Sequence, residues 1–254
     1  MTDFRSADFY DDLAGTYDLI YADWWSAAVR TGEVLARLLE GLAPPASILD
    51  CTCGIGTQAL PLAAKGFRVT GTDLSGRSID RARAEAAARG LAGEFHQADV
   101  RDIPELGEFD AVISCDNSLP HLLTDEDLGR ALTSIRRRLR PGGLLLATIR
   151  DYDQILRDGV QGVPPRIHGT GRDRRIIAQA WEWADDRRTL TLNHIMITQT
   201  GTGWDTAVRT TTYRALRRAE LDTALQTAGF TAIRWAFPDD SGYYQPVVTA
   251  RAPG

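Results

Sequence analysis

The sequence predicts an α/β fold with a doubly wound, mostly parallel sheet and an antiparallel insertion. Two observations carry this prediction. Between residues 47 and 149, short apolar runs alternate with amphipathic segments, a rhythm typical of βα units joined by right-handed crossovers. After residue 152 the rhythm changes to three longer runs of alternating polar and apolar residues, which indicates an antiparallel sheet with one face in water.

The predicted elements follow in chain order. A helix is predicted over 31–41. In the α/β core we expect strands at 47–51, 67–72, 94–97, 109–114 and 144–149, and helices at 57–65, 78–89 and 125–140. Insertion strands at 175–183, 189–199 and 207–216 precede a helix at 217–228, and strands at 230–237 and 245–251 complete a seven-stranded main sheet. The expected divisions are an N-terminal helical lid (1–43), a core (44–151 and 216–254) and an inserted substrate-side subdomain (152–215).

Composition narrows the function classes. The chain has 254 residues and a formal net charge of −5, which disfavours nucleic-acid or membrane binding and favours a small-molecule ligand. No run of about 18 apolar residues is present, so a cytoplasmic protein is expected. Cys51, Cys53 and Cys115 are an odd number of cysteines, which argues against a disulfide framework, and we expect them to be core residues with no metal site.

A glycine turn after the first strand is the most informative motif. Gly54 and Gly56 lie between a strand and a helix, where a missing Cβ lets a ligand approach the backbone. Asp73 ends the next strand, where its carboxylate can accept both hydroxyl protons of a ribose. A nicotinamide dinucleotide fits this pattern, with Ala59 at the third glycine position of its fingerprint, and so does S-adenosylmethionine.

Two further strand ends favour S-adenosylmethionine. Asp99 can accept a hydrogen bond from the adenine amino group while Val100 packs on the ring, and Asp116 ends the fourth strand. In an open α/β sheet these strand ends converge on one crevice.

With these motifs the sequence resembles the class I S-adenosylmethionine-dependent methyltransferases, which have a Rossmann-like fold. The resemblance covers residues 46–150 and rests on the motifs LDCTCGIG, VTGTD, ADV, FDAVIS and RPGGLLL in this order. Within that family it is most similar to the glycine N-methyltransferase group, through Asn117-Ser118 followed by His121-Leu122 and through the R-D-Y-D run at 150–153.

The resemblance implies a role for each matching residue. His121 would lie near the cofactor's sulfonium, and Arg150 would bind a substrate carboxylate beside Asn117, a role that suits the planar guanidinium fork. The rival interpretation of Arg150 is an ion pair with Asp151 or Asp153. The cofactor-binding residues would be Tyr10, Tyr21, Cys53, Gly54, Gly56, Asp73, Leu74, Asp99, Val100, Asp116 and His121.

The insertion departs from the family pattern. His194 stands where a substrate-enclosing tyrosine would fall, and Tyr213 keeps another such tyrosine. Together with His121, these two are the candidates for accepting the amine proton. Tyr17 and Tyr21 are four residues apart, so they are expected on one helical face, and the aromatic N-terminal segment is expected to form a lid over the sulfonium.

The predicted function is S-adenosylmethionine-dependent methylation of a small molecule, by in-line displacement on the nitrogen of an amino acid or related carboxylated amine. A small-molecule O-methyltransferase of secondary metabolism is the alternative. A nicotinamide-dependent oxidoreductase and a non-catalytic cofactor-binding protein are weaker alternatives, and methylation of nucleic acid is disfavoured. A homo-oligomer is left open.

Overall fold

A mixed seven-stranded sheet forms the centre of the protein in the computed structural model, which describes residues 4–39 and 41–254. Its strand order is β10-β11-β5-β4-β1-β2-β3, in which β11 runs antiparallel to both of its neighbours and the other adjacent pairs are parallel. The strands are β1 (Ser47–Asp50), β2 (Arg68–Asp73), β3 (Glu94–Gln97), β4 (Phe109–Ser114), β5 (Leu139–Thr148), β10 (Thr231–Ala236) and β11 (Val247–Arg251). The predicted fold class is confirmed.

Helices cover both faces of this sheet because successive strand residues bury to opposite sides. Ile48 of β1 packs into one hydrophobic core and Leu49 into the other. The helices on the Ile48 side are α2 (Trp24–Leu38), α3 (Ala59–Ala64) and α4 (Gly76–Ala88), and those on the Leu49 side are α5 (Asp125–Arg137) and α7 (Arg218–Thr227). A short helix α8 (Pro238–Ser241) precedes β11. Thr124 caps α5, because its side chain accepts a hydrogen bond from the backbone N–H of Asp127.

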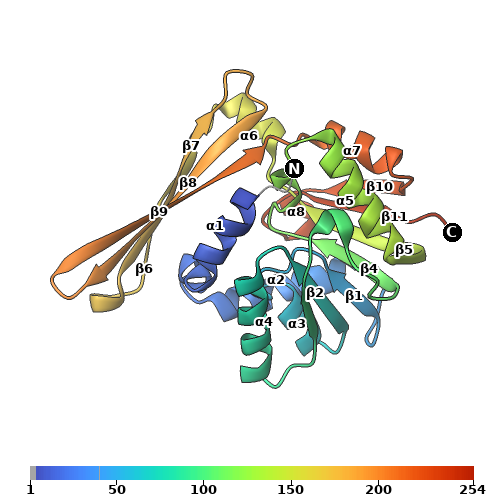
Figure 1. Ribbon diagram of the computed structural model, residues 1–254, viewed down its shortest axis with the longest axis horizontal. Helices are drawn as coiled ribbons and strands as arrows, with labels where there is room; N and C mark the ends of the chain where they lie inside the picture. Colours follow the sequence, from blue (N-terminus) through green and yellow to red (C-terminus); the bar gives the residue numbers. More distant parts are fainter. Residues whose placement is uncertain (1–3, 40) are drawn as a thin grey trace.

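The insertion after β5 is a four-stranded antiparallel sheet in the order β6-β7-β8-β9. It consists of β6 (Gly162–His168), β7 (Arg175–Trp183), β8 (Thr189–Thr200) and β9 (Gly203–Arg214), and it follows helix α6 (Tyr152–Asp158). Figure 1 shows this sheet as an arm beside the main domain, with α1 (Phe4–Ala14) lying between the two. The inner face of the arm, defined here by Trp181, Leu190, Leu192, His194 and Tyr213, is buried.

The sequence pattern missed elements that carry few periodic apolar residues. Strand β6 contains Pro164 and Pro165 and is mostly exposed, so it shows no alternation. Helix α2 begins seven residues earlier than predicted, because Asp23 caps it through the backbone N–H of Ser26. The expected helical face for Tyr17 and Tyr21 is wrong: a single 3₁₀ turn, η1 (Tyr17–Ile20), holds their ring centroids 6.2 Å apart.

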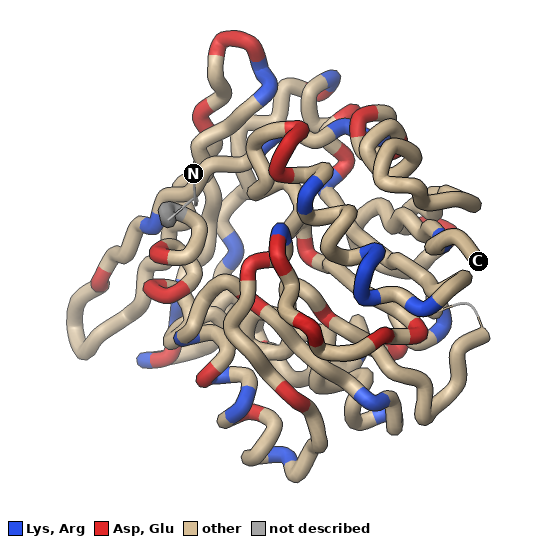
Figure 2. Tube along the Cα trace, turned by 45° about the vertical axis from the view of Figure 1, so that its right-hand side comes forward, with Lys and Arg blue, Asp and Glu red and all other residues tan. Residues whose placement is uncertain are grey.

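The surface carries both signs of charge. In Figure 2 acidic and basic positions are interspersed over the chain. Cys51, Cys53 and Cys115 are buried and unbonded to one another, as expected for core residues. Within residues 4–39 and 41–254, none of the helices has the length and apolar character needed to cross a lipid bilayer.

Candidate functional site

A cavity of about 570 Å³ opens at the carboxyl ends of β1, β2 and β4. Strand ends in an open α/β sheet are where ligands bind, because the loops there diverge and leave backbone groups exposed. The structure brings most of the predicted cofactor residues to this cavity: Tyr10, Cys53, Gly54, Asp73, Leu74, Asp99, Val100, Asp116 and His121. From the segment that contains the 3₁₀ turn η1, Tyr17 lines the cavity and Tyr21 does not.

The glycine turn and Asp73 are held together by backbone hydrogen bonds. Asp73 Oδ2 accepts from the N–H of Gly54 at 2.8 Å, and Oδ1 accepts from the N–H of Ser75 at 2.9 Å. Burial raises the pKa of Asp73, and these two N–H groups oppose the shift. A Cβ on Gly54 would meet nothing within 4 Å, so open space lies against the backbone there.

Gly56 has a different role from Gly54. Its φ of +91° lies in the left-handed region, and a Cβ there would come within 2.8 Å of the Leu60 side chain. Gly56 therefore allows the loop to pack on α3 and does not line the cavity.

Asp50 is a buried acid that the sequence analysis missed. It is fully buried at the end of β1, and its Oδ2 has no hydrogen-bond partner in the described part of the chain. Burial raises the pKa of Asp50 well above the ordinary range, and the nearby carboxylates of Asp73 and Asp116 raise it further. Its position directly before the glycine turn was the available signal.

Asp99 reaches the cavity with its carboxylate already engaged. The Arg101 side chain binds both carboxylate oxygens at 2.6–3.0 Å, and it also pairs with Asp127 at 3.1 Å. Although burial opposes it, this pairing holds the pKa of Asp99 below its usual range. Asp99 and Val100 therefore both line the cavity, and Arg101 orients the Asp99 carboxylate.

The turn after β4 is strained. Asp116 and Asn117 have φ values of 58° and 67°, a conformation that residues other than glycine rarely adopt. Asp116 Oδ1 accepts from the hydroxyls of Tyr243 and Tyr244, each at 2.6 Å, and Oδ2 accepts from Gln58 at 2.7 Å. The two tyrosines lie more than 120 residues away in the chain, so no local pattern predicted them.

Asn117 positions the backbone beside Arg150. The Asn117 side chain is buried, accepts from the Arg150 N–H at 2.9 Å and donates to the Tyr152 hydroxyl at 3.0 Å. These bonds fix the chain at the junction between β5 and the insertion. Asn117 thus connects the strained turn to the residue expected to bind substrate.

Arg150 lies between two aromatic rings of the inner face. Its guanidinium carbon is 4.9 Å from the centroid of Trp181 and 5.5 Å from that of Tyr213. Its Nη2 donates to Gln179 at 3.1 Å, while its Nη1 is buried without a partner among the described residues.

The two carboxylates that follow Arg150 in the sequence are paired with another arginine. Arg218 pairs with Asp151 at 2.6 Å and with Asp153 at 3.4 Å. The rival interpretation, in which Arg150 is the partner of these acids, is therefore wrong.

Tyr10, His121 and Tyr213 form a hydrogen-bonded group between the core and the insertion. The Tyr10 hydroxyl lies 2.9 Å from His121 Nε2 and 3.2 Å from the Tyr213 hydroxyl. Burial lowers the pKa of His121 to about 3, and the Arg150 charge contributes in the same direction. The imidazole is therefore neutral at pH 7. Burial also raises the pKa of both tyrosines, so their hydroxyls keep their protons.

Two predicted site residues lie apart from this group. Tyr21 does not line the cavity, and its carbonyl accepts a hydrogen bond from Arg175 at 2.6 Å. His194 is 2% exposed on the inner face, opposite Gln179 in the β7–β8 register, and neither of its ring nitrogens has a partner in the described structure.

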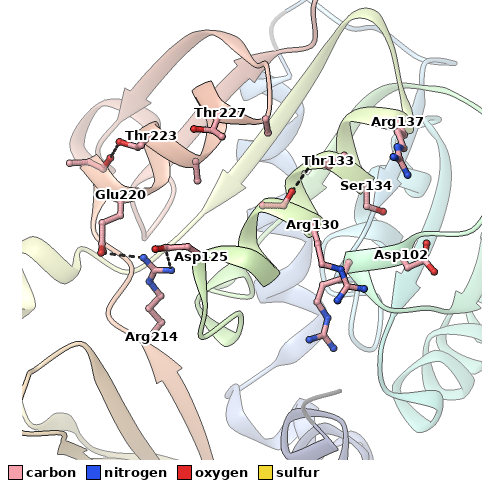
Figure 3. A pocket seen from close by; sticks show the side chains of 15 residues that line it. Asp102, Asp125, Arg130, Thr133, Ser134, Arg137, Arg214, Glu220, Thr223 and Thr227 are labelled. Atoms are coloured by element: carbon pink, nitrogen blue, oxygen red, sulfur yellow. Dashed lines mark hydrogen bonds and ion pairs between the residues drawn. The ribbon is translucent and has the colours of Figure 1, made fainter. Parts of the chain in front are cut away.

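A second hollow, of about 1030 Å³, lies between α5 and α7 (Figure 3). Arg214 bridges its mouth by pairing with Asp125 at 2.7 Å and Glu220 at 3.2 Å. Because this hollow lies away from the glycine turn and its buried arginine is already paired, the cavity at the strand ends is the better candidate site.

Comparison with known proteins agrees with this geometry. Residues 48–143 match the family model of a methyltransferase domain. Residues 48–143 therefore form a methyltransferase domain of the class I S-adenosylmethionine-dependent family. S-adenosylmethionine is the methyl donor of this family. The cavity offers groups that fit this cofactor, namely the Asp73 carboxylate at the end of β2 and open space against the backbone of Gly54.

Two curated relatives of this chain are named for different substrates. A glycine/sarcosine N-methyltransferase of Parasynechococcus marenigrum is 32% identical over 160 residues, which cover 62% of this chain and 56% of the relative. A dTDP-3-amino-3,4,6-trideoxy-alpha-D-glucopyranose N,N-dimethyltransferase of Streptomyces venezuelae is 31% identical over 149 residues, covering 58% and 61%. The match thus spans little more than half the length of these relatives.

The fold similarity extends further along the chain. The crystal structure of DesVI from Streptomyces venezuelae has a TM-score of 0.80 and 22% identity, and the match covers 95% of this chain and 98% of that one. At this identity the likeness shows the fold, insertion included.

Proposed function

We propose that this protein transfers the methyl group of S-adenosylmethionine to the amine nitrogen of a small molecule that carries an anionic group. The observation that carries the proposal is Arg150, a half-buried arginine whose Nη1 is buried without a hydrogen-bond partner and whose guanidinium has no carboxylate partner in the described chain. Burying an unpaired charge is costly, so such a group indicates a ligand that brings the opposite charge. A substrate carboxylate matches the guanidinium fork.

The chain's own residues would position and desolvate the acceptor. S-adenosylmethionine supplies an electrophilic methyl group on a positively charged sulfur. Arg150 binds the anionic end of the substrate, and Asn117 fixes the backbone of Arg150. His121, a candidate for accepting the amine proton, lies at the cavity wall with Ser6 Oγ 3.3 Å from its Nδ1 and the Tyr10 hydroxyl 2.9 Å from its Nε2. Because both ring nitrogens are engaged and burial lowers its pKa to about 3, His121 is a weak base, and its neutral ring adds no positive charge to the site. Placing a neutral amine in line with the methyl carbon in a dry site is the main contribution expected from such an enzyme.

An amino sugar is the second candidate for the acceptor. The relative that acts on a dTDP-linked amino sugar is about as similar to this chain as the glycine/sarcosine enzyme. In addition, His194 replaces a tyrosine that would enclose glycine in the glycine N-methyltransferase group. Both candidates share the same reaction and an anionic acceptor.

The test is an acceptor panel with S-adenosylmethionine labelled in its methyl group, read by mass spectrometry. The panel contains glycine, sarcosine, larger amino acids, uncharged amines, catechols and nucleotide-linked amino sugars. We expect an N-methyl product from anionic amines and none from the uncharged amines of equal size. A product from catechols alone would replace the proposal with O-methylation, and tight cofactor binding without any product would indicate a non-catalytic protein.

A further inference from the structure

The inner face of the four-stranded sheet collects buried polar atoms that lack partners. Eleven buried side-chain nitrogen or oxygen atoms have no hydrogen-bond partner in the described residues, and five of them lie on or against this face. They are Arg150 Nη1, His194 Nδ1, His194 Nε2, Arg209 Nη1 and Thr211 Oγ1. Unsatisfied buried polar groups are rare in folded proteins, and a cluster of them calls for a ligand.

Strand register places these residues in two adjacent rows. Gln179, His194 and Arg209 are direct neighbours across β7, β8 and β9. The next row consists of Trp181, Leu192 and Thr211. Because side chains alternate along a strand, both rows point to the same side as Tyr213.

Arg150 and Arg209 lie at opposite ends of the first row. Arg150 donates to Gln179 on β7, whereas Arg209 is on β9. Neighbouring strands are about 4.8 Å apart, so the backbones of β7 and β9 at the two ends of the row are separated by about 10 Å. His194 lies between them.

The charges of this row are not balanced within the described chain. Neither guanidinium forms an ion pair there, and each has a buried nitrogen without a partner. Burial and the Arg209 charge lower the pKa of His194 to about 4, so its neutral ring can donate one hydrogen bond to a ligand. Water could satisfy single hydrogen bonds, but only an anion offsets the charge.

We infer that Arg209, His194 and Thr211 form a second anion-binding subsite, and that the acceptor amine carries two anionic groups, one on Arg150 and one at this subsite. The inference rests on the proposed function and specifies its substrate class. The second group is a carboxylate or a phosphate, which present the same acceptor chemistry to a guanidinium and a hydroxyl. Glycine, with a single carboxylate, would occupy only half of the site.

Calorimetric titration of the protein saturated with S-adenosylhomocysteine tests this inference. The probes are glycine with one anionic group, L-glutamate with two carboxylates, and inorganic pyrophosphate. Arg209→Gln is the test variant, and Thr211→Val is a second one that conserves shape. Arg166→Gln is the matched control, because Arg166 is an exposed arginine of β6 in the same sheet.

We expect Arg209→Gln to weaken the binding of pyrophosphate or L-glutamate 10- to 100-fold and to change the affinity for glycine less than twofold. Thr211→Val should weaken binding of the same probe. A larger loss for pyrophosphate identifies a phosphate ligand, and a larger loss for L-glutamate identifies a dicarboxylate. Equal affinities in Arg209→Gln and the Arg166→Gln control would overturn the subsite while leaving the proposed function intact. Failure of the unmodified protein to bind S-adenosylhomocysteine would instead refute the proposed function.

Discussion

Replacement of Arg150 by methionine is expected to move substrate affinity and protein stability in opposite directions. Methionine has a similar length and fills the space between Trp181 and Tyr213 without a charge. The unliganded protein then no longer buries a guanidinium whose Nη1 lacks a partner. The substrate, in contrast, loses the only charge proposed to hold its first anionic group.

The magnitudes follow from the contacts. A hydrogen bond to a charged group contributes about 1.5–3 kcal/mol, so loss of the fork weakens binding by about 3 kcal/mol, or roughly 150-fold in KM. On the stability side, relief of the buried charge offsets the lost Gln179 hydrogen bond and ring contacts. The free energy of unfolding therefore stays level or rises by about 1 kcal/mol.

The assays are initial-rate kinetics on the best acceptor of the panel and urea unfolding without ligand. Arg157→Met, an exposed arginine of α6, is the matched control. S-adenosylhomocysteine affinity should change less than twofold in both variants. A parallel fall of stability and affinity in Arg150→Met would show that the guanidinium is a structural group and would refute the reasoning.

Three further predictions concern the cofactor side. Asp73→Asn should weaken S-adenosylmethionine binding by about 2 kcal/mol, near 30-fold by calorimetry, because charge-assisted bonds to the ribose are lost; an unchanged Kd would remove Asp73 from the cofactor site. The pKa of His121 is about 3 in the folded protein and near 6.5 in the unfolded chain. As the pH falls below 6.5, the unfolded chain therefore takes up a proton that the folded protein does not, and the free energy of unfolding decreases. Between pH 7 and 5, unliganded His121→Gln should therefore lose about 1–2 kcal/mol less than the unmodified protein in urea unfolding, and parallel curves would contradict this. Gly56→Ala should lower the free energy of unfolding by about 2 kcal/mol, because the residue has a left-handed φ and a Cβ there would contact Leu60. Gly129→Ala is the control and should not lower it, because a Cβ at this position of helix α5 meets open space. Equal changes in the free energy of unfolding for the two variants would exclude strain as the cause.

The core fold was predictable because its signals are local. Strands β3 and β4 were predicted at their observed bounds, and the glycine turn with Asp73 indicated the cofactor edge of the sheet from 20 residues of sequence. Such features depend on hydrophobic period and on the need for glycine at a tight turn.

The substrate side was predictable only in part because its contacts are distant in sequence. Arg150 was identified through family resemblance, but its aromatic neighbours and its partner Gln179 come from another sheet. Arg209 had no sequence signal at all, since an arginine in an alternating strand usually marks the wet face. Alternation along the strand puts Arg209 on the face of Tyr213, but only the register of β8 and β9 places it beside His194.

The position of Tyr10 has a consequence for biosynthesis. Its hydroxyl contacts His121 and Tyr213, which follow it by 111 and 203 residues. A chain emerging from the ribosome therefore completes β1 to β5 well before the wall between core and insertion can exist, because N-terminal parts fold first. The first five strands of the main sheet are therefore made early in translation, whereas the wall formed by Tyr10, His121 and Tyr213 can exist only once Tyr213 has been made.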